Sequence, residues 1–276
     1  MEEKILKKKF MKEPLIVLIR GAGEMASGVA HRLIRSHFKV CLLDIPMPLA
    51  VRRGVSYCEA IYEEEKEVEG IRAKAIEAPE KIGPVWNEGK IPLLVDPTGK
   101  KTRDFLKPDV LVDAILAKEN LGTKIDDAPL VIGLGPGFTA EKDVHLVVET
   151  NRGHQLGKVI FKGSAETDSG VPGEIGGFTT ERVLRTIKTG TFHSQFSIGD
   201  HVGKGSVIAV VDDFPVIAEI SGMVRGLLRE GTKVKKGMKV GDIDPRGKRE
   251  HCFTISEKAR AIGGGVLEAI LYWYNR

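Results

Sequence analysis

Two glycines and an acidic residue have the spacing of a phosphate-binding loop. Gly21, Gly23 and Ala26 follow the pattern G-x-G-x-x-G/A, and Asp44 comes 21 residues after Gly23. The first glycine permits a sharp turn, the second lets backbone N–H groups approach a pyrophosphate, and the small Ala26 lets helix and strand pack. The acid can accept a hydrogen bond from a ribose hydroxyl. The pattern predicts a nucleotide site formed by Gly21, Gly23, Glu24, Met25, Ala26 and Asp44.

The segments around this loop have the patterns that such a site requires. Residues 14–20 form an apolar run typical of a strand, and Met25–Ser36 has helical periodicity with apolar positions on one face. A second apolar run, 39–45, contains Asp44 near its end. The alternative is that the glycines only close a strand-to-helix turn. Arg52 and Arg53 can serve a second phosphate, but a role on a solvated helix face is favoured slightly.

Residues 14–128 alternate apolar runs with helical stretches. The expected strands are continuous apolar runs, as in a parallel sheet that is buried on both faces. This β-α-β rhythm predicts an α/β protein with a Rossmann-like parallel sheet. The strands are expected at 14–20, 39–45, 68–76, 91–97 and 110–116.

Residues 129–189 form a glycine-rich α/β extension with many polar side chains. Strands are expected at 129–137, 144–150 and 156–163, and a short helix at 179–188. We expect the loops at 133–138 and 173–179 to face a cleft, with Gly135, Gly137, Phe138, Gly176 and Gly177 as further ligand-binding residues. His145 and His154 lack the close spacing of paired metal ligands, so no metal site is predicted.

Residues 190–248 contain one β unit twice. The segment 199–213 aligns with 231–244 at an offset of 32 residues, and Gly199, Val202, Lys204 and Gly205 recur in the second copy. Such a repeat resembles a biotinyl/lipoyl-type barrel-sandwich hybrid. A carrier of that type has a lysine in the hairpin between its halves, and the hairpin expected at 211–220 has none. A docking or scaffolding role is therefore favoured over a carrier role.

The two ends of the chain complete the division into domains. Residues 1–13 form a charged, lysine-rich tail, and 249–276 end the chain in a helix for which Ser256 is the expected N-cap. Three consecutive glycines at 263–265 lie within that helix. They indicate either a break in the helix or close packing of another backbone.

Composition excludes several classes of protein. The chain has 42 basic and 38 acidic residues without a concentrated basic run, which argues against a nucleic-acid partner. No apolar run is long enough for a membrane span, and no targeting signal is evident. The three cysteines, Cys41, Cys58 and Cys252, form no C-x-x-C pair, which favours buried thiols in a reducing cytosol.

Several motifs together resemble a known family of accessory proteins. The stretches "RGAGEMASGVAHRL", "VDAILAKENLGT", "VIGLGPGFTAEKDVHLVVETNRGHQLGKVI" and "GVPGEIGGFTTERVLR" are similar to accessory proteins of selenium-dependent molybdenum hydroxylases. The similarity extends from about residue 14 to 272. It implies a cytoplasmic maturation factor that prepares or inserts a selenium-bearing molybdopterin-type cofactor, with the hydroxylase apoprotein as its partner. It brings no settled set of catalytic residues.

The leading hypothesis is therefore a maturation protein that binds a nucleotide or a nucleotide-bearing molybdopterin cofactor. NAD(P), a cytidine- or guanosine-type nucleotide and a molybdopterin derivative are all compatible with the loop. One alternative is an NAD(P)-dependent oxidoreductase, with His145, His154 or Lys118 as proton donor. Another is a non-catalytic interaction scaffold. The sequence leaves open whether the chain catalyses a reaction and whether it forms a homo-oligomer.

Overall fold

Strand β1 (Ile16–Arg20) lies inside a nine-stranded sheet in the computed structural model, which describes residues 14–275. It pairs in parallel with β2 (Lys39–Asp44) on one side and with β6 (Val110–Asp113) on the other. The strand order is β10-β9-β7-β6-β1-β2-β5-β4-β3. The remaining strands are β3 (Glu65–Val68), β4 (Ile71–Ile76), β5 (Ile91–Val95), β7 (Leu130–Leu134), β9 (Leu146–Val148) and β10 (Val159–Ile160).

Parallel pairing dominates the sheet, and the antiparallel pairs lie at its two edges. β3 pairs with β4 and β10 pairs with β9 in antiparallel register. The single strand expected at 68–76 is therefore wrong at its start, because the chain turns at Glu69–Gly70 and forms a hairpin there. Strands β7, β9 and β10 come from the glycine-rich extension, yet they continue the sheet that the first 128 residues begin.

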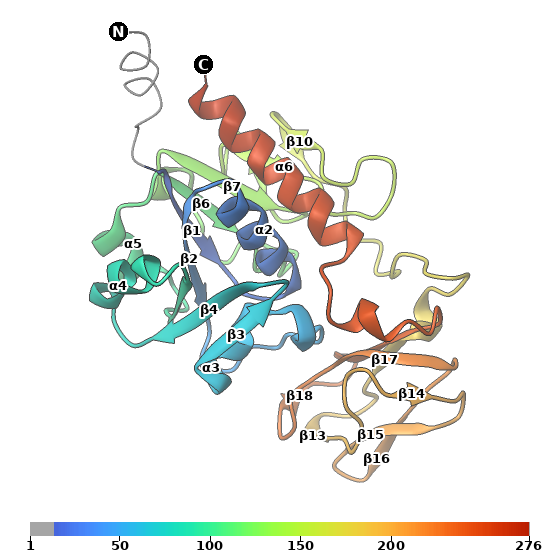
Figure 1. Cartoon of the computed structure of the whole chain (residues 1–276). Coiled ribbons are helices and arrows are strands. Elements are labelled where there is room, and N and C mark those ends of the chain that lie inside the picture. Colours follow the sequence, from blue (N-terminus) through green and yellow to red (C-terminus); the bar gives the residue numbers. More distant parts are fainter. Residues whose placement is uncertain (1–13, 276) are drawn as a thin grey trace, which may run out of the picture.

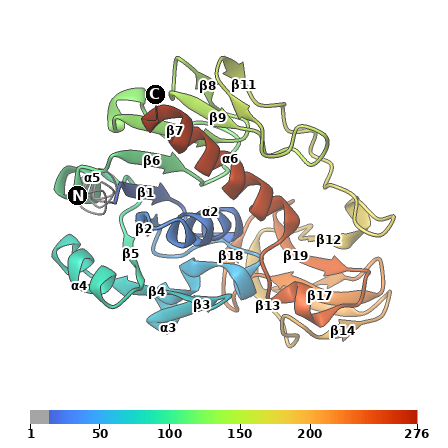
Figure 2. The same ribbon diagram turned by 45° about the horizontal axis from the view of Figure 1, so that its top comes forward.

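Helices cover both faces of this sheet (Figures 1 and 2). Because side chains alternate along a strand, Val17 and Ile19 face α2 (Glu24–Arg35) and α6 (Glu257–Tyr274), whereas Leu18 joins the core on the opposite face. That second face is covered by the short helices α4 (Ile82–Asn87) and α5 (Lys100–Leu106), together with the paired strands β8 (Thr139–Ala140) and β11 (Gly163–Ser164). A further short helix is α3 (Ala60–Glu63).

Helices α2 and α6 run side by side in the same direction. A Cβ at Gly28 would lie 2.7 Å from the Cβ of Ala259, and a Cβ at Gly263 would lie 3.3 Å from the Cβ of Arg32. Gly28 and Arg32 are four residues apart on α2, and their partners Ala259 and Gly263 are four residues apart on α6 in the same order. The two helices are therefore parallel. The three glycines do not break α6, which is continuous, and the expectation of close backbone packing is confirmed. Ser256 is its N-cap, because its Oγ accepts the N–H of Ala259 at 3.3 Å.

The C-terminal strands form two antiparallel four-stranded sheets that enclose a separate apolar core. One sheet has the order β12-β19-β17-β14 and the other β16-β15-β13-β18. Their bounds are β12 (Val183–Arg185), β13 (Gly190–His193), β14 (His201–Val202), β15 (Val207–Val211), β16 (Phe214–Ile217), β17 (Gly222–Leu227), β18 (Lys233–Val234) and β19 (Lys239–Asp244). We call this unit the sandwich.

The internal repeat of the sequence becomes a pseudo-symmetric exchange of strands. β13, β14 and β15 correspond to β17, β18 and β19 at the offset of 32 residues. Each copy gives its second strand to the other copy's sheet: β13 pairs with β18, and β17 pairs with β14. The registers agree, since Gly190 is opposite Val234 and Gly222 is opposite Val202. The repeat is therefore structural as well as sequential.

One helix expected from the sequence is absent. Residues 179–188 form a turn of 3-10 helix at Thr180–Arg182 and then strand β12. Val183 and Leu184 pair with β19, so the contacts of the sandwich prevail over local helical preference.

The prediction of an α/β protein is confirmed at the level of architecture. The chain has a mixed, mostly parallel nine-stranded sheet and small antiparallel C-terminal sheets. Within residues 14–275, none of the helices combines the length and the apolar character needed to cross a membrane.

Candidate functional site

The glycine loop turns sharply where β1 ends. Gly21 has φ +95°, a backbone conformation that favours glycine, and its N–H donates to the Leu43 carbonyl at 2.8 Å. A Cβ at Gly21 would lie 3.0 Å from the carbonyl oxygen of Ala114, which follows β6. The loop therefore passes closely between the ends of two neighbouring strands, and only a residue without a side chain fits there.

Helix α2 begins directly after this turn and leaves its first amides unpaired within the helix. Gly23 is the N-cap in an extended conformation, and no side chain caps the helix. The first helical bond runs from the N–H of Ser27 to the carbonyl of Gly23, so the amides of Glu24 and Met25 have no intrahelical acceptor. A Cβ at Gly23 would meet nothing within 4 Å, and Gly23, Glu24 and Met25 all line a cavity.

Asp44 fixes the loop from the end of β2. Its Oδ2 accepts the N–H of Ala22 at 2.9 Å, and its Oδ1 accepts the N–H of Ile45 at 2.8 Å. Burial raises the pKa of the Asp44 carboxyl, although both backbone hydrogen bonds act in the opposite direction. Each oxygen still has a lone pair available, so the carboxylate can accept a ligand hydroxyl while it holds the loop.

The loop lies where the order of the strands reverses. From β1 the chain continues to β2 on one side, and after β5 it returns to β6 on the other side. In open α/β sheets, ligands bind in the crevice outside the carboxyl ends of the strands at such a switch point. The end of β1 is held there by Arg20, which is 6% exposed and pairs with the buried Asp113 at 3.2 Å. Thr123 donates to the same carboxylate at 2.6 Å.

A cavity of about 590 Å³ opens at this edge of the sheet. We call it the sheet-edge lobe, and its walls include Gly21, Gly23 and Asp44. Further walls are apolar side chains that follow the strand ends, among them Leu49 and Leu121, each about half exposed. The volume is within the range of small-molecule sites, about 300–1,000 Å³. An apolar wall beside a carboxylate and free amides suits a nucleoside with phosphate.

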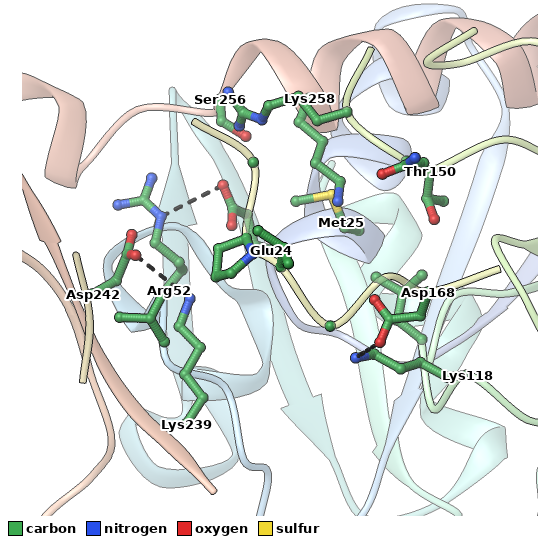
Figure 3. A pocket seen from close by; sticks show the side chains of 18 of the residues that line it. Glu24, Met25, Arg52, Lys118, Thr150, Asp168, Lys239, Asp242, Ser256 and Lys258 are labelled. Carbon is green, nitrogen blue, oxygen red and sulfur yellow. Dashed lines mark hydrogen bonds and ion pairs between the residues drawn. The ribbon is translucent and has the colours of Figure 1, made fainter. Parts of the chain in front are cut away.

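A second cavity of about 350 Å³ adjoins the first. We call it the strap lobe, because the segment 166–175 crosses it between the sheet and the sandwich. Lys118 holds this segment through an ion pair with Asp168, and Figure 3 shows that pair at the side of the lobe. The sandwich contributes Arg225 and Asp242 to the opposite wall.

Six residues line both lobes and mark the junction between them. They come from the start of α2, from the loop after β6, from the segment after β2, from β19 and from the start of α6. Figure 3 shows the side chains of Glu24, Met25, Arg52, Lys239 and Lys258. The six are Glu24, Met25, Arg52, Leu116, Lys239 and Lys258.

Arg52 connects the sheet domain to the sandwich. It is 6% exposed and donates to the carbonyl of Arg225 at 2.9 Å and to that of His251 at 3.1 Å. Its Nε lies 3.5 Å from a carboxylate oxygen of Glu24 and has no hydrogen-bond partner among residues 14–275. Arg53 donates to the Leu227 carbonyl at 2.7 Å. The favoured role on a solvated helix face is therefore wrong for Arg52, which is buried between two units.

The structure brings some of the sequence-predicted residues together. Gly21, Gly23, Glu24, Met25 and Asp44 all line the sheet-edge lobe. Ala26 lies in the core beneath it, where it is fully buried.

The candidates of the second glycine region lie elsewhere. Gly135 packs against Thr150, and Gly137 against the backbone of Glu119. Phe138 is 4% exposed and packs under Gly133. Gly176 contacts Pro245, while Gly177 has open space around its Cα. Their neighbours Pro136, Gly173 and Ile175 line the strap lobe instead.

The proton donors considered from the sequence have different surroundings. His145 Nδ1 accepts the N–H of Val131 at 3.0 Å, and burial lowers the pKa of His145. Lys118 lines the strap lobe, whereas neither His145 nor His154 lines either lobe. In the part of the chain that the structure describes, no three His, Cys, Asp or Glu side chains gather as a metal site would require.

Sequence reasoning missed the residues that the sandwich and the last helix bring to the junction. Arg225, Lys239 and Lys258 lie some 200 residues beyond the glycine loop, and no local motif marks them. Only the position of Lys258 two residues after the predicted N-cap Ser256 indicated that it lies at a helix start.

Two solved structures that align with the chain do so at low TM-scores. An aspartoacylase family protein from Mesorhizobium loti aligns with a TM-score of 0.25 and 10% identity, over 84% of this chain and 85% of its own. The product-bound ectoine utilization protein EutE (DoeB) from Ruegeria pomeroyi aligns with a TM-score of 0.24 and 14% identity, over 83% and 85%. Scores this low support no argument about function.

Sequence comparison is more specific. No family model matches the chain. A relative from Escherichia coli (strain K12), "Uncharacterized protein YqeB", is 49% identical over 256 residues, which is 93% of this chain. The chain spans about half the length of that relative, 47%. The chain is thus a homologue of Escherichia coli YqeB.

Proposed function

We propose that this chain binds a nucleotide, or a nucleotide-bearing molybdopterin cofactor, as an accessory protein in the maturation of a selenium-dependent molybdenum hydroxylase. One observation carries the binding part of the proposal. The unpaired amides at the start of α2 face an open cavity at the switch point of a parallel sheet, beside Asp44.

The sheet-edge lobe has a place for each part of a nucleotide. Phosphoryl oxygens would accept hydrogen bonds from the amides of Glu24 and Met25, where the helix dipole favours negative charge. A ribose hydroxyl would donate to Asp44, and a base would lie against Leu49 and Leu121. The acidic Asp44 suits a free 2′-hydroxyl better than a 2′-phosphate, so NAD fits this end better than NADP.

The maturation role rests on the sequence resemblance. The motifs that carry it include the glycine loop and the strap segment, which together form walls of the two lobes. We also propose the finer fold assignments, a Rossmann-like sheet and a barrel-sandwich hybrid. The exchanged strands of the sandwich support the second. Its β15–β16 turn, at Asp212 and Asp213, has no lysine, so the hybrid would serve docking. The proposed location is the cytoplasm.

The test is a ligand panel followed by thermal unfolding of the full chain. CDP, GDP, CMP, GMP, NAD and NADP are each added at increasing concentration. A ligand at 100 times its dissociation constant adds about 2.7 kcal/mol to the free energy of unfolding. We expect at least one nucleotide to raise Tm, and mass spectrometry of the purified protein to detect a retained nucleotide or pterin.

The alternatives give different outcomes. An NAD(P)-dependent oxidoreductase would bind NAD or NADP and exchange a hydride with an added carbonyl or hydroxyl substrate. Lys118, in the strap lobe, would be its proton donor. A scaffold would show no shift with any nucleotide and would still co-purify with the hydroxylase apoprotein. The first result would overturn the maturation role, and the second would overturn the proposed ligand class.

A further inference from the structure

Two helix N-termini meet at the junction of the two lobes. Because α2 and α6 pack in parallel, with Gly28 against Ala259 and Arg32 against Gly263, their first turns lie next to each other. Figures 1 and 2 show the two helices side by side. Each N-terminus carries a partial positive charge. Because the two first turns are neighbours, both partial charges would attract an anion at the junction.

Lys258, in the first turn of α6, adds a full charge to this volume. Figure 3 shows its side chain directed from α6 toward Met25 at the start of α2. Among residues 14–275, it has no hydrogen bond and no ion pair through its Nζ. It is partly buried, and it lines both lobes. A lysine held in such a place without a carboxylate partner is a costly arrangement for the free protein.

Two further cations lie around Lys258. Arg52 is buried, and its Nε lacks a hydrogen-bond partner although Glu24 is 3.5 Å away. Lys239, from β19, lies 3.5 Å from Asp242, a carboxylate that is also paired with Arg182. Asp242 is thus shared among several cations, and Glu24 acts on Lys258 only through space, without an ion pair.

The strap lobe as a whole has an excess of positive charge. Eight Lys and Arg side chains line it, against four Asp and Glu. The sheet-edge lobe is nearly balanced, with four against three. The whole chain has an excess of four. Among the residues that line the two lobes, the excess of cationic side chains therefore lies in the strap lobe rather than beside Asp44.

We propose that the junction is an anion subsite, in which the ammonium group of Lys258 and the first turn of α6 bind the second phosphoryl group of a diphosphate. The first phosphoryl group lies at the start of α2. This inference rests on the proposed function and narrows the ligand class to diphosphate-containing compounds. Inorganic phosphate at the α2 amides alone would leave Lys258 unneutralised.

The position of the junction between two cavities suits a diphosphate that carries an organic group at each end. One organic group would occupy the sheet-edge lobe, the diphosphate would lie at the junction, and a second group would extend into the strap lobe. Glu24 and Met25 line both cavities, so a single ligand at these residues can extend into each cavity. A nucleoside diphosphate linked to a second group has this form.

The test compares diphosphates with monophosphates on three forms of the full chain. Isothermal titration uses inorganic pyrophosphate, CDP against CMP, and GDP against GMP. The forms are the unmodified chain, Lys258→Met, and Lys204→Met as a control for lost charge on an exposed part of the sandwich. Because the buried ammonium group of Lys258 has no ion pair in the free protein, we expect Lys258→Met to fold with a Tm at least as high as that of the unmodified chain.

We expect the unmodified chain to bind the diphosphate more tightly than its monophosphate. Lys258→Met should weaken diphosphate binding about ten-fold or more, as loss of a charge-assisted hydrogen bond does, with little effect on the monophosphate. Lys204→Met should bind like the unmodified chain, and Lys258→Arg should restore most of the affinity.

Each other outcome has a distinct meaning. Equal binding of CDP and CMP, and of GDP and GMP, unaffected by Lys258→Met, would overturn the subsite while the nucleotide function stands. Pyrophosphate binding that depends on Lys258, without any nucleotide binding, would keep the subsite and overturn the proposed function. No binding of pyrophosphate or of any nucleotide would overturn both.

Discussion

The carboxylate of Asp44 accepts the backbone N–H of Ala22 at 2.9 Å, so the end of β2 holds the glycine loop that follows β1. The same carboxylate accepts the N–H of Ile45 at 2.8 Å. One side chain therefore fixes the loop and remains available to a ligand. Any change at this position acts on stability and on binding together.

Asp44→Asn removes one of the two acceptor oxygens. One of the two amides then loses its partner in a partly buried position, which costs about 1–3 kcal/mol in the free energy of unfolding. Urea denaturation of both proteins measures the loss. An equally stable variant would mean that the loop does not depend on this contact.

The pH dependence of Asp44 has a definite sign. Burial raises its pKa in the folded state above the ordinary value of 3.8, so the folded protein takes up the proton first as pH falls. The free-energy contribution of Asp44 to stability therefore increases as pH decreases through its folded-state pKa toward 3.8. The stability of the unmodified chain relative to Asp44→Asn should rise over that interval. A relative fall would show that the two amide bonds outweigh burial.

Adjacent glycines of α6 should respond in opposite ways to alanine. A Cβ at Gly264 would meet nothing within 4 Å, whereas a Cβ at Gly265 would overlap the carbonyl oxygen of Gly157. Gly264→Ala should stabilise the chain by up to about 1 kcal/mol through helix propensity. Gly265→Ala should destabilise it by about 1–3 kcal/mol or more, because backbone must move. Thermal unfolding of the pair tests the packing, and similar effects at both positions would contradict it.

Anion binding should be accompanied by proton uptake at Lys258. Burial, followed by the charge of Arg152, lowers its pKa from 10.5, and Lys239 acts in the same direction. Glu24 and Glu149 act against this shift. A bound diphosphate would raise the pKa again, so binding takes up protons between the free protein's pKa and 10.5. Titrations of pyrophosphate in buffers of different ionisation enthalpy measure the uptake, and Lys258→Met should abolish it. Uptake that persists in that variant would assign it to another group.

Lys258 also gives stability a pH dependence in the free protein. Because its folded-state pKa is lowered, the unfolded chain binds the proton more strongly, and stability rises with pH through that pKa toward 10.5. Lys258→Met should flatten this part of the stability curve. An unchanged curve would show that Lys258 is well solvated.

The sequence was sufficient for the elements that local patterns determine. The apolar runs around Gly21 predicted β1, β2, β5 and β6, and the spacing from Gly23 to Asp44 predicted that the loop and the acid meet. Such features depend on residues within one β-α-β unit, where periodicity and turn chemistry carry the information. The internal repeat likewise predicted the sandwich region.

Other features depend on contacts between distant segments. Residues 183–185 form a strand because β19 pairs with them, and no local signal indicates that partner. Gly135 and Gly176 were expected to face a ligand, but their missing side chains accommodate Thr150 and Pro245. Lys258 lines the same cavity as Gly21 and Gly23 because α6 packs along α2. The three consecutive glycines predicted that another backbone packs against α6, but they did not indicate that this backbone is α2.

The most direct test of the account is binding of CDP, GDP and NAD to Gly23→Val, measured by isothermal titration beside the unmodified chain. Gly23 has φ −72° in an extended conformation, and its Cβ position is open, so valine fits the backbone and fills the mouth of the sheet-edge lobe. We predict a Tm within a few degrees of that of the unmodified chain. Gly23 makes no side-chain capping bond, so its replacement lowers the free energy of unfolding by about 1 kcal/mol or less. We also predict loss of the nucleotide binding that the unmodified chain shows. Nucleotide binding of unchanged affinity in a folded Gly23→Val would contradict a phosphate site at the start of α2.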